Sequence, residues 1–95
     1  MHNEALVSRR LVIRGRVQGV GFRWSAMTLA QRLGLGGWVR NCRDGSVEVL
    51  VCGPHEEVAA LIHWAGKGPA GARVDQVVVE EAEERLSGFS QQASI

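Results

Sequence analysis

The sequence predicts a single α+β domain in which strands and helices follow one another in the order β-α-β-β-α-β. Two stretches carry apolar residues at helical spacing, and four others are rich in β-branched residues or alternate in polarity. Turns that contain glycine or proline separate these stretches. A length of 95 residues suits one hydrophobic core, so we expect residues 1–95 to form a single domain.

The first part of the chain predicts a strand, a loop and a helix. The segment Leu11–Val17 is rich in β-branched residues and favours a strand. Glycines interrupt regular structure in Arg16–Gly21, which we expect to be a loop. A helix is predicted to begin at Phe22 and to end at Gly34. Its apolar face consists of Phe22, Ala26, Leu29, Ala30 and Leu33.

A β-hairpin is predicted next. Residues 38–42 and 46–51 have strand character, and Asp44-Gly45 between them is a turn signal. A two-residue turn at this dipeptide would place Arg43 opposite Ser46. The valines of the second strand alternate with Glu48 and its neighbours, as in a strand with two different faces.

A second helix and a last strand complete the predicted fold. Pro54 suits the first helical position, acidic residues follow in the first turn, and Gly66 ends the helix. Its buried stripe is Val58, Leu61, Ile62 and Ala65. Arg73–Glu80 is the fourth strand, and Phe89 anchors a short final strand. Right-handed crossovers then give a four-stranded antiparallel sheet with both helices on one face, the ferredoxin-like sandwich.

The expected core spans about residues 7–90. The polar ends, Met1–Val7 and Gln91–Ile95, are expected to fray. No apolar run reaches six residues, which excludes a membrane span of about 20. No apolar h-region precedes the basic residues near the start, so we expect no secretory signal. The domain is therefore expected to be a cytoplasmic monomer.

The two cysteines do not predict a disulfide or a metal site. In the hairpin register above, Cys42 lies opposite Val47 and Cys52 opposite Gly37, which separates the thiols by about 17 Å. This distance is far beyond the reach of a disulfide. The three histidines are scattered without metal-ligand spacing. We therefore expect no metal and no cofactor.

Charge is distributed unevenly along the chain. Residues 1–43 carry eight arginines and a single acid, whereas residues 44–95 carry nine acids and three basic residues. Such an asymmetry points to an anionic ligand near the N-terminal half. A general arginine bias in the genome would produce the same pattern, and both interpretations stay open at this point.

The loop Arg16–Gly21 is the segment with the clearest chemical character. Glycines allow successive N–H groups to converge, and the start of the following helix adds unpaired donors and a positive dipole end. The spacing differs from the dinucleotide motif and from the P-loop. Arg23 adds positive charge where the helix dipole disfavours it, which suggests an anion between its guanidinium and the loop. A tight turn followed by a solvated arginine is the simpler alternative.

Several motifs together resemble the acylphosphatase family. They are Gly-Arg-Val-Gln-Gly-Val-Gly-Phe-Arg at residues 15–23, Leu-Gly-Leu-Gly-Gly-Trp-Val-Arg-Asn at 33–41, and Asp-Gly-Ser-Val-Glu at 44–48. Gly68-Pro69, Ala72 and Val74 also fit. The resemblance covers most of the chain, from about Leu11 to Glu80.

The resemblance implies a metal-free and cofactor-free hydrolase that cleaves acyl phosphates into carboxylate and inorganic phosphate on a ferredoxin-like sandwich. It places the catalytic arginine at Arg23 and the catalytic asparagine at Asn41. Asn41 would hold the attacking water, because an amide both accepts and donates hydrogen bonds. Taken alone, Asn41 suits a turn equally well. The resemblance assigns phosphate binding to Arg16, Val17, Gln18, Gly19, Val20, Gly21 and Phe22.

The same fold suits three other functions. An RNA-binding module would need exposed aromatics on its two central strands, and Leu11–Val17 and Ser46–Val51 carry none. A metallochaperone would need a C-x-x-C pair, which the sequence lacks. An acylphosphatase-like domain of carbamoyl-transfer machinery would be fused to zinc-finger segments, and none is present. We therefore expect a small-molecule acyl phosphate as partner, with no nucleic acid and no membrane, although the sequence does not specify which acyl phosphate.

Overall fold

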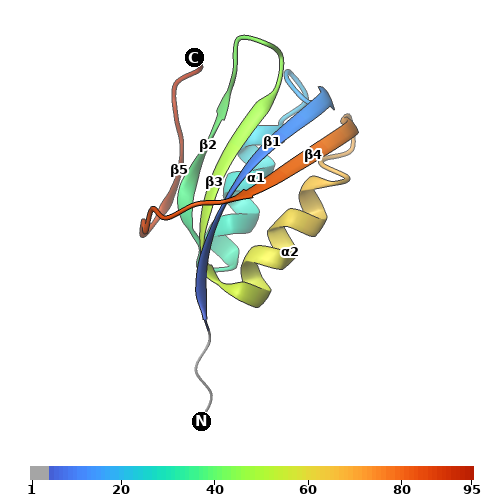
Figure 1. Cartoon of the computed structure of the whole chain (residues 1–95). Coiled ribbons are helices and arrows are strands. Elements are labelled where there is room, and N and C mark those ends of the chain that lie inside the picture. The colour runs from blue at the N-terminus through green and yellow to red at the C-terminus, as the bar shows by residue number, and fades with distance from the viewer. Residues whose placement is uncertain (1–4) are drawn as a thin grey trace.

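Two helices cover one face of a five-stranded sheet in the computed structural model, which describes residues 5–95 (Figure 1). The strands lie in the order β4-β1-β3-β2-β5. The elements are β1 (Leu6–Arg16), α1 (Phe22–Arg32), β2 (Gly36–Asn41), β3 (Val47–Pro54), α2 (His55–Ala65), β4 (Arg73–Glu81) and β5 (Phe89–Gln91). The predicted α+β class, with both helices on one face, is confirmed. Neither helix in the described part of the chain is long and apolar enough to cross a membrane.

The sheet differs from the prediction in its fifth strand. β5 pairs in parallel with β2, so the sheet is mixed rather than four-stranded and antiparallel. β4 and β5 lie at opposite edges, and the connection 82–88 crosses the open face of the sheet between them (Figure 1). Because of this crossing β5 runs parallel to β2, whereas the prediction gave a wholly antiparallel sheet.

The C-terminal residues continue along β2, although their polar composition predicted fraying. The Gln92 N–H donates to the Val39 carbonyl at 2.8 Å, and the Ile95 N–H donates to the Asn41 carbonyl at 3.1 Å. At the other end, β1 begins at Leu6, within the segment expected to fray. The prediction of fraying for residues 1–4 lies outside the described residues.

The core lies between the sheet and the helices. The predicted alternation is confirmed, because Leu11 and Ile13 of β1 are fully buried together with the valines of β3. α1 contributes Phe22, Ala26 and Ala30, and α2 contributes Val58, Leu61 and Ala65. Gly34 takes a φ of +74° after α1, as a residue that ends a helix in the left-handed region does.

The open face of the sheet is also partly buried, which the sequence did not predict. The Ser8 hydroxyl and the Cys52 thiol both donate to the carbonyl of Glu84, in the crossing connection. Beside them, Glu48 pairs with Arg10 at 3.1 Å and with Arg40 at 2.7 Å. The crossing connection thereby fixes the path of the chain toward β5.

The hairpin register is one residue away from the predicted one. Asn41 pairs with Val47, and a three-residue loop replaces the predicted two-residue turn. The Gly45 N–H donates to the Cys42 carbonyl, and the Cys42 N–H donates to the Ser46 carbonyl. Gly45 has a φ of +94°, which completes a turn followed by a left-handed residue. Cys52 therefore lies opposite Gly36 instead of Gly37, and both cysteines are free.

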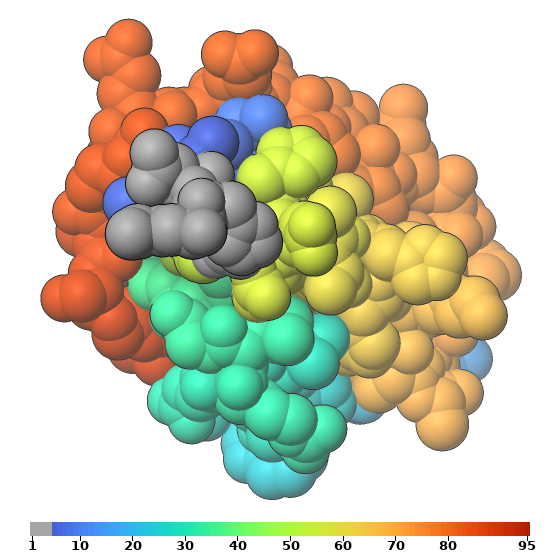
Figure 2. Space-filling model, turned by 90° about the horizontal axis from the view of Figure 1, so that it is seen from below, coloured from blue at the N-terminus to red at the C-terminus, as the bar shows by residue number. Residues whose placement is uncertain are grey.

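The end of the molecule shown in Figure 2 brings the α1–β2 connection against the start of α2. A β-carbon at Gly53 would lie 2.4 Å from Leu35 Cδ2, so the buried Leu35 side chain packs directly on the Gly53 backbone. Pro54 is the residue before α2 rather than its first helical residue, a difference of one position. The loop with the glycines lies at the opposite end of the sheet, where β1 ends and α1 begins.

Candidate active site

A cavity of about 130 Å³ opens at this end of the sheet. It joins the loop after β1, the first turn of α1, the end of β2 and the end of β5. The residues that line it are Val17, Gly19, Gly21, Phe22, Arg23, Trp24, Asn41 and Gln91. Both residues that the family resemblance marked as catalytic, Arg23 and Asn41, therefore lie on one small cavity although 18 positions separate them in the chain.

The two glycines of the loop are required by backbone angle rather than by space. Gly19 has a φ of +75° and Gly21 a φ of +81°, and a β-carbon at either would meet no atom within 4 Å. Gly21 is also the residue before α1, and no side chain caps this helix start. The first N–H groups of an α-helix lack partners inside the helix. These donors are available to a ligand at this end of α1.

Phe22 fixes the start of α1 against the core. Its ring is buried and contacts Trp64 of α2, with ring centroids 5.1 Å apart and a tilt of 52°. A β-carbon at Gly68 would lie 2.7 Å from Phe22 Cε2, so the loop after α2 also fits closely around this ring. This anchoring leaves Arg23, the next residue, on the cavity side.

Arg23 has no carboxylate partner among residues 5–95. The ion pairs in that part of the chain involve other arginines, and the first turn of α1 contains no acidic residue. A guanidinium beside a helix N-terminus is unfavourable unless an anion lies close by. An anion that entered the cavity would therefore meet the unpaired guanidinium and the helix N–H groups together.

Asn41 ends β2 on the helix side of the sheet. Val39, two residues earlier, is fully buried in the core, and residues two apart share a face. The Asn41 Oδ1 atom is buried and accepts no hydrogen bond from residues 5–95. A buried acceptor without a protein donor is normally satisfied by water or ligand. The side chain therefore presents an open hydrogen-bonding position beside the cavity.

Three of the predicted phosphate-binding residues lie outside the cavity lining. Arg16 is the last residue of β1 and lies opposite Arg73 of β4 in the strand register. Val20 packs near Gly71, with Val20 Cβ and Cγ1 3.6 Å from the position of a β-carbon there. The Gln18 side chain turns away from the cavity and toward the β2–β3 turn. The structure thus brings together Val17, Gly19, Gly21, Phe22, Arg23 and Asn41 from the predicted set.

Gln18 connects the glycine loop to the turn that follows Asn41. Its Nε2 atom donates to the Cys42 carbonyl at 2.8 Å and to the Ser46 carbonyl at 2.9 Å. Asp44 stabilises the same turn, since its Oδ1 accepts from the Ser46 hydroxyl at 2.6 Å and from the Ser46 N–H at 3.0 Å. These two bonds, with the Arg14 guanidinium, lower the pKa of Asp44 to about 2.

Two further residues of the cavity were not assigned a role in the sequence-based site. Trp24, the residue after Arg23, lines the cavity with a side chain that is 62% exposed. Gln91 was not predicted, because its position depends on the parallel pairing of β5. Phe89 and Gln91 are two residues apart, so they face the same side of a strand. This spacing is the one sequence signal that could have indicated Gln91.

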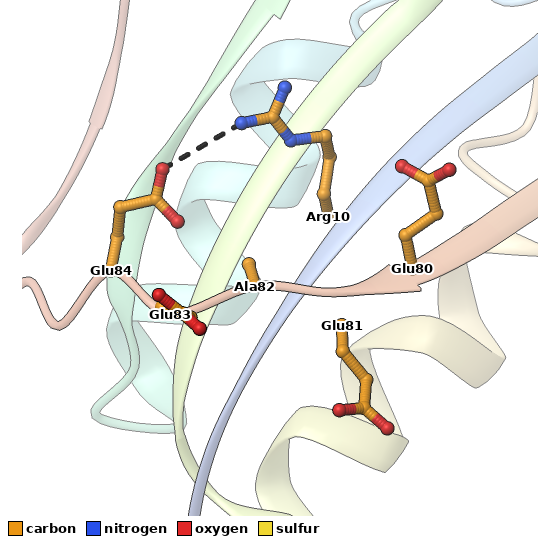
Figure 3. A pocket seen from close by; sticks show the side chains of 6 residues that line it. All are labelled: Arg10, Glu80, Glu81, Ala82, Glu83 and Glu84. Atoms are coloured by element: carbon orange, nitrogen blue, oxygen red, sulfur yellow. Dashed lines mark ion pairs between the residues drawn. The ribbon is translucent and has the colours of Figure 1, made fainter.

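A wider hollow of about 670 Å³ lies at the other side of the sheet. Arg10 and the acidic residues of the segment 80–84 line it, and the Glu84 carboxylate lies 3.7 Å from the Arg10 guanidinium (Figure 3). Glu80 extends to the same side as Arg10, whereas Glu81 points to the opposite side (Figure 3). The hollow has an excess of carboxylates and therefore does not suit an anionic ligand. Within residues 5–95, no three His, Cys, Asp or Glu side chains gather in an arrangement that could hold a metal ion.

The fold and the cavity define a class of small α+β sandwich domains with a glycine loop and an arginine at the end of the sheet. A family model described as Acylphosphatase matches residues 9–91. An Acylphosphatase from Azoarcus sp. (strain BH72) is 56% identical over 80 residues, which cover 84% of this chain and 82% of that relative. The chain belongs to the acylphosphatase family and is a hydrolase of that type.

Solved structures agree with this assignment. An acylphosphatase from Coxiella burnetii has a TM-score of 0.89 and 35% identity, and the match covers 97% of this chain and 100% of that one. Full-length HypF in its phosphate- and nucleotide-bound form has a TM-score of 0.88 and 27% identity. That match covers 98% of this chain and only 13% of HypF.

Proposed function

We propose that this chain hydrolyses the carboxyl–phosphate bond of acyl phosphates in the 130 Å³ cavity without a metal ion. The observation that carries the proposal is the meeting on one cavity of an uncapped helix start with an arginine and a buried amide oxygen that have no partner among residues 5–95. These three features supply what the reaction needs: binding of the phosphate charge, stabilisation of the transition state, and positioning of water.

The phosphate group binds between the glycine loop and Arg23. An acyl phosphate carries about two negative charges near neutral pH. The guanidinium binds two phosphate oxygens at once, and the N–H groups of residues 19–22 approach the others. Because these donors are held before the substrate arrives, they also stabilise the charge on the equatorial oxygens in the transition state. Gly19 and Gly21 allow the loop backbone to approach the ligand closely.

Asn41 positions the attacking water. Its buried Oδ1 accepts a hydrogen bond from the water, which points an oxygen lone pair at phosphorus. A neutral amide cannot remove the proton, so its contribution is orientation. The water oxygen forms a bond to phosphorus while the bond from phosphorus to the carboxyl oxygen breaks. The water proton passes to a phosphate oxygen of the substrate, and the carboxylate leaves without needing a general acid.

Free hydrolysis is favoured over a role as a fused domain in a larger enzyme. The chain is 56% identical to an Acylphosphatase and 27% identical to HypF, of which the matching part is only 13%. We further propose a cytoplasmic monomer that binds neither nucleic acid nor membrane. The free thiols of Cys42 and Cys52 suit a reducing compartment.

Hydrolysis of benzoyl phosphate in the presence of EDTA tests this function. We expect turnover by the wild type and a loss of about two orders of magnitude in kcat/KM for Arg23→Ala and for Asn41→Ala. Arg32→Ala is a matched control, because Arg32 lies on the same helix in its last turn, far from the cavity. A folded wild type without turnover in EDTA, or equal losses for Arg23→Ala and Arg32→Ala, would contradict the proposal.

A further inference from the structure

We propose that Trp24 and Gln91 form an acyl subsite that selects substrates with a planar, uncharged acyl group. This inference rests on the proposed function, because it assigns the part of the substrate that leaves as carboxylate. Both residues line the same cavity as Arg23 and Asn41, but they come from α1 and β5 respectively.

The lining of the cavity separates the phosphate from the acyl group. The glycine loop, Arg23 and Asn41 are the lining residues that meet the phosphate and the attacking water in the proposed function. Trp24 and Gln91 are the two that remain, and they come from other parts of the fold than Asn41 and the loop. The acyl group therefore lies against these two residues.

Trp24 presents an apolar surface in this part of the lining. Its side chain is 62% exposed, whereas the neighbouring Phe22 is 2% exposed in the core. The other large exposed apolar side chains of residues 5–95 do not line this cavity: Leu6, Val78, Val79, Leu86 and Ile95. An indole left in water beside a ligand cavity gains most from a flat apolar group that covers it. A phenyl-sized acyl group would do so, and an acetyl group would cover much less of the ring.

Gln91 is held in place by the pairing of β5. Val39 of β2 is its partner in the parallel register, and Gln31 Nε2 donates to the Phe89 carbonyl at 3.0 Å. Phe89 is buried against the core, so the residue two positions later faces the same side. Gln91 thus lines the cavity, and its amide is available as a donor for the carbonyl oxygen of the acyl group. Since every acyl phosphate has this carbonyl, Gln91 serves all of them, whereas Trp24 discriminates.

Charge in the cavity lining restricts the acyl group further. Arg23 is the one charged residue among those that line the cavity, and the phosphate neutralises it. A charged substituent on the acyl group would therefore find no partner of opposite sign there. The chemical class that fits is an aromatic or similarly flat acyl phosphate without a second charge.

Steady-state hydrolysis of benzoyl phosphate and acetyl phosphate by the same variants tests the subsite. Trp24→Ala is expected to lower kcat/KM for benzoyl phosphate by about three- to ten-fold and for acetyl phosphate by less than about two-fold. Trp24→Phe should retain most of the preference. Gln91→Ala should lower both substrates by a similar factor of about three to ten, as expected for one lost hydrogen bond. Leu86→Ala, an exposed apolar residue outside this cavity, is the matched control.

Inorganic phosphate distinguishes the two parts of the site. Its inhibition constant should be unchanged in Trp24→Ala, because phosphate binds in the cradle alone. Equal losses for the two substrates in Trp24→Ala, or no loss for Gln91→Ala, would overturn the subsite while Arg23→Ala still abolished turnover. If the wild type hydrolysed neither substrate, the proposed function would fail and the subsite with it.

Discussion

Removal of the Gln18 side chain should separate stability from catalysis at this site. Gln18→Ala deletes the bonds from Nε2 to the Cys42 and Ser46 carbonyls, at 2.8 and 2.9 Å. Those bonds are the side-chain link between the glycine loop and the turn directly after Asn41. The variant changes no residue that lines the cavity.

The loss of stability can be worked out from these contacts. Each net hydrogen bond contributes about 0.5–1.5 kcal/mol, so two give about 1–3 kcal/mol. Neither carbonyl is left unpaired, since the Cys42 carbonyl still accepts from the Gly45 N–H and the Ser46 carbonyl from the Cys42 N–H. We therefore expect the lower half of that range. For a domain of this size, about 1 kcal/mol corresponds to a fall in Tm of about 4–8 °C.

The effect on catalysis should be larger than the stability loss alone implies. Without the link, the loop and Asn41 move independently, and a displacement of about 1 Å between catalytic groups can cost about 100-fold in rate. We expect kcat/KM for benzoyl phosphate to fall by about ten- to hundred-fold at a temperature well below Tm. Ile62→Val is a control of similar instability, because it removes one half-buried methylene in α2 at a cost of about 0.5–1.5 kcal/mol. A Gln18→Ala variant with lower Tm but wild-type kcat/KM would refute the positioning role.

Three further predictions concern the loop, the turn and β5. Gly19→Ala should weaken the binding of inorganic phosphate more than it lowers stability, because a φ of +75° costs alanine about 1–2 kcal/mol and the loop can relax only by moving its N–H groups. The rise of Tm with added phosphate measures the binding, and equal losses of stability and phosphate affinity would contradict a phosphate-binding loop. Asp44→Asn should lower Tm at pH 7, and the Tm difference from the wild type should shrink as the pH falls from about 4 toward 2. The reason is that the pKa of Asp44 is about 2 in the folded protein and about 3.9 in the unfolded chain, so a Tm difference independent of pH would refute the role of the charge. Phe89→Ala should cost about 3–5 kcal/mol in urea unfolding and should also lower kcat/KM, because Phe89 holds the strand that carries Gln91.

Local patterns predicted most of the fold because local physics determines it. The helical face of α1 and the alternation of valines in β3 are direct consequences of the 3.6- and 2-residue periods. Gly34 and Gly66 ended the helices where expected. These features depend on neighbours in the chain, so they are visible in the sequence.

The features that were predicted wrongly depend on contacts between distant segments or on turn geometry. The register of the hairpin shifted by one residue because Asp44 and Gly45 form a three-residue loop with Arg43, and both loop lengths suit an Asp-Gly pair. The parallel direction of β5 follows from the connection 82–88 crossing the open face, where it contacts Ser8 and Cys52. No periodicity in residues 82–88 signals that path.

The candidate site was predicted through the glycine loop, Arg23 and Asn41, and its remaining parts needed the fold. The backbone glycines and the arginine are adjacent in sequence, so their meeting was foreseeable. Gln91 joins them through β5, some 50 residues after Asn41 in the chain. The Gln18 side chain was grouped with the phosphate-binding loop, whereas its amide bonds to the β2–β3 turn.

Strand pairing in the sheet accounts for much of the uneven charge of the two halves of the chain. Antiparallel pairing places the basic β1 between β3 and the acidic end of β4, with Arg10 opposite Glu80 in the register. Arg10 and Arg40 then share Glu48, and Arg14 pairs with Asp44 at 3.0 Å. The asymmetry along the sequence thus reflects cross-strand pairing more than an extended anion-binding surface.

Arg23 differs from these arginines in its place on the fold. It lies at the start of a helix rather than on a strand, so no acidic residue of a neighbouring strand pairs with it. Residues 5–95 contain no ion pair of Arg23. The helix dipole makes that position costly for a cation unless an anion occupies the cavity. An arginine that the fold does not neutralise, beside a loop that only glycine can form, is most simply explained by a ligand with negative charge. The charge distribution therefore supports a phosphate site of the size of one group, confined to the cavity that Arg23 and Asn41 share.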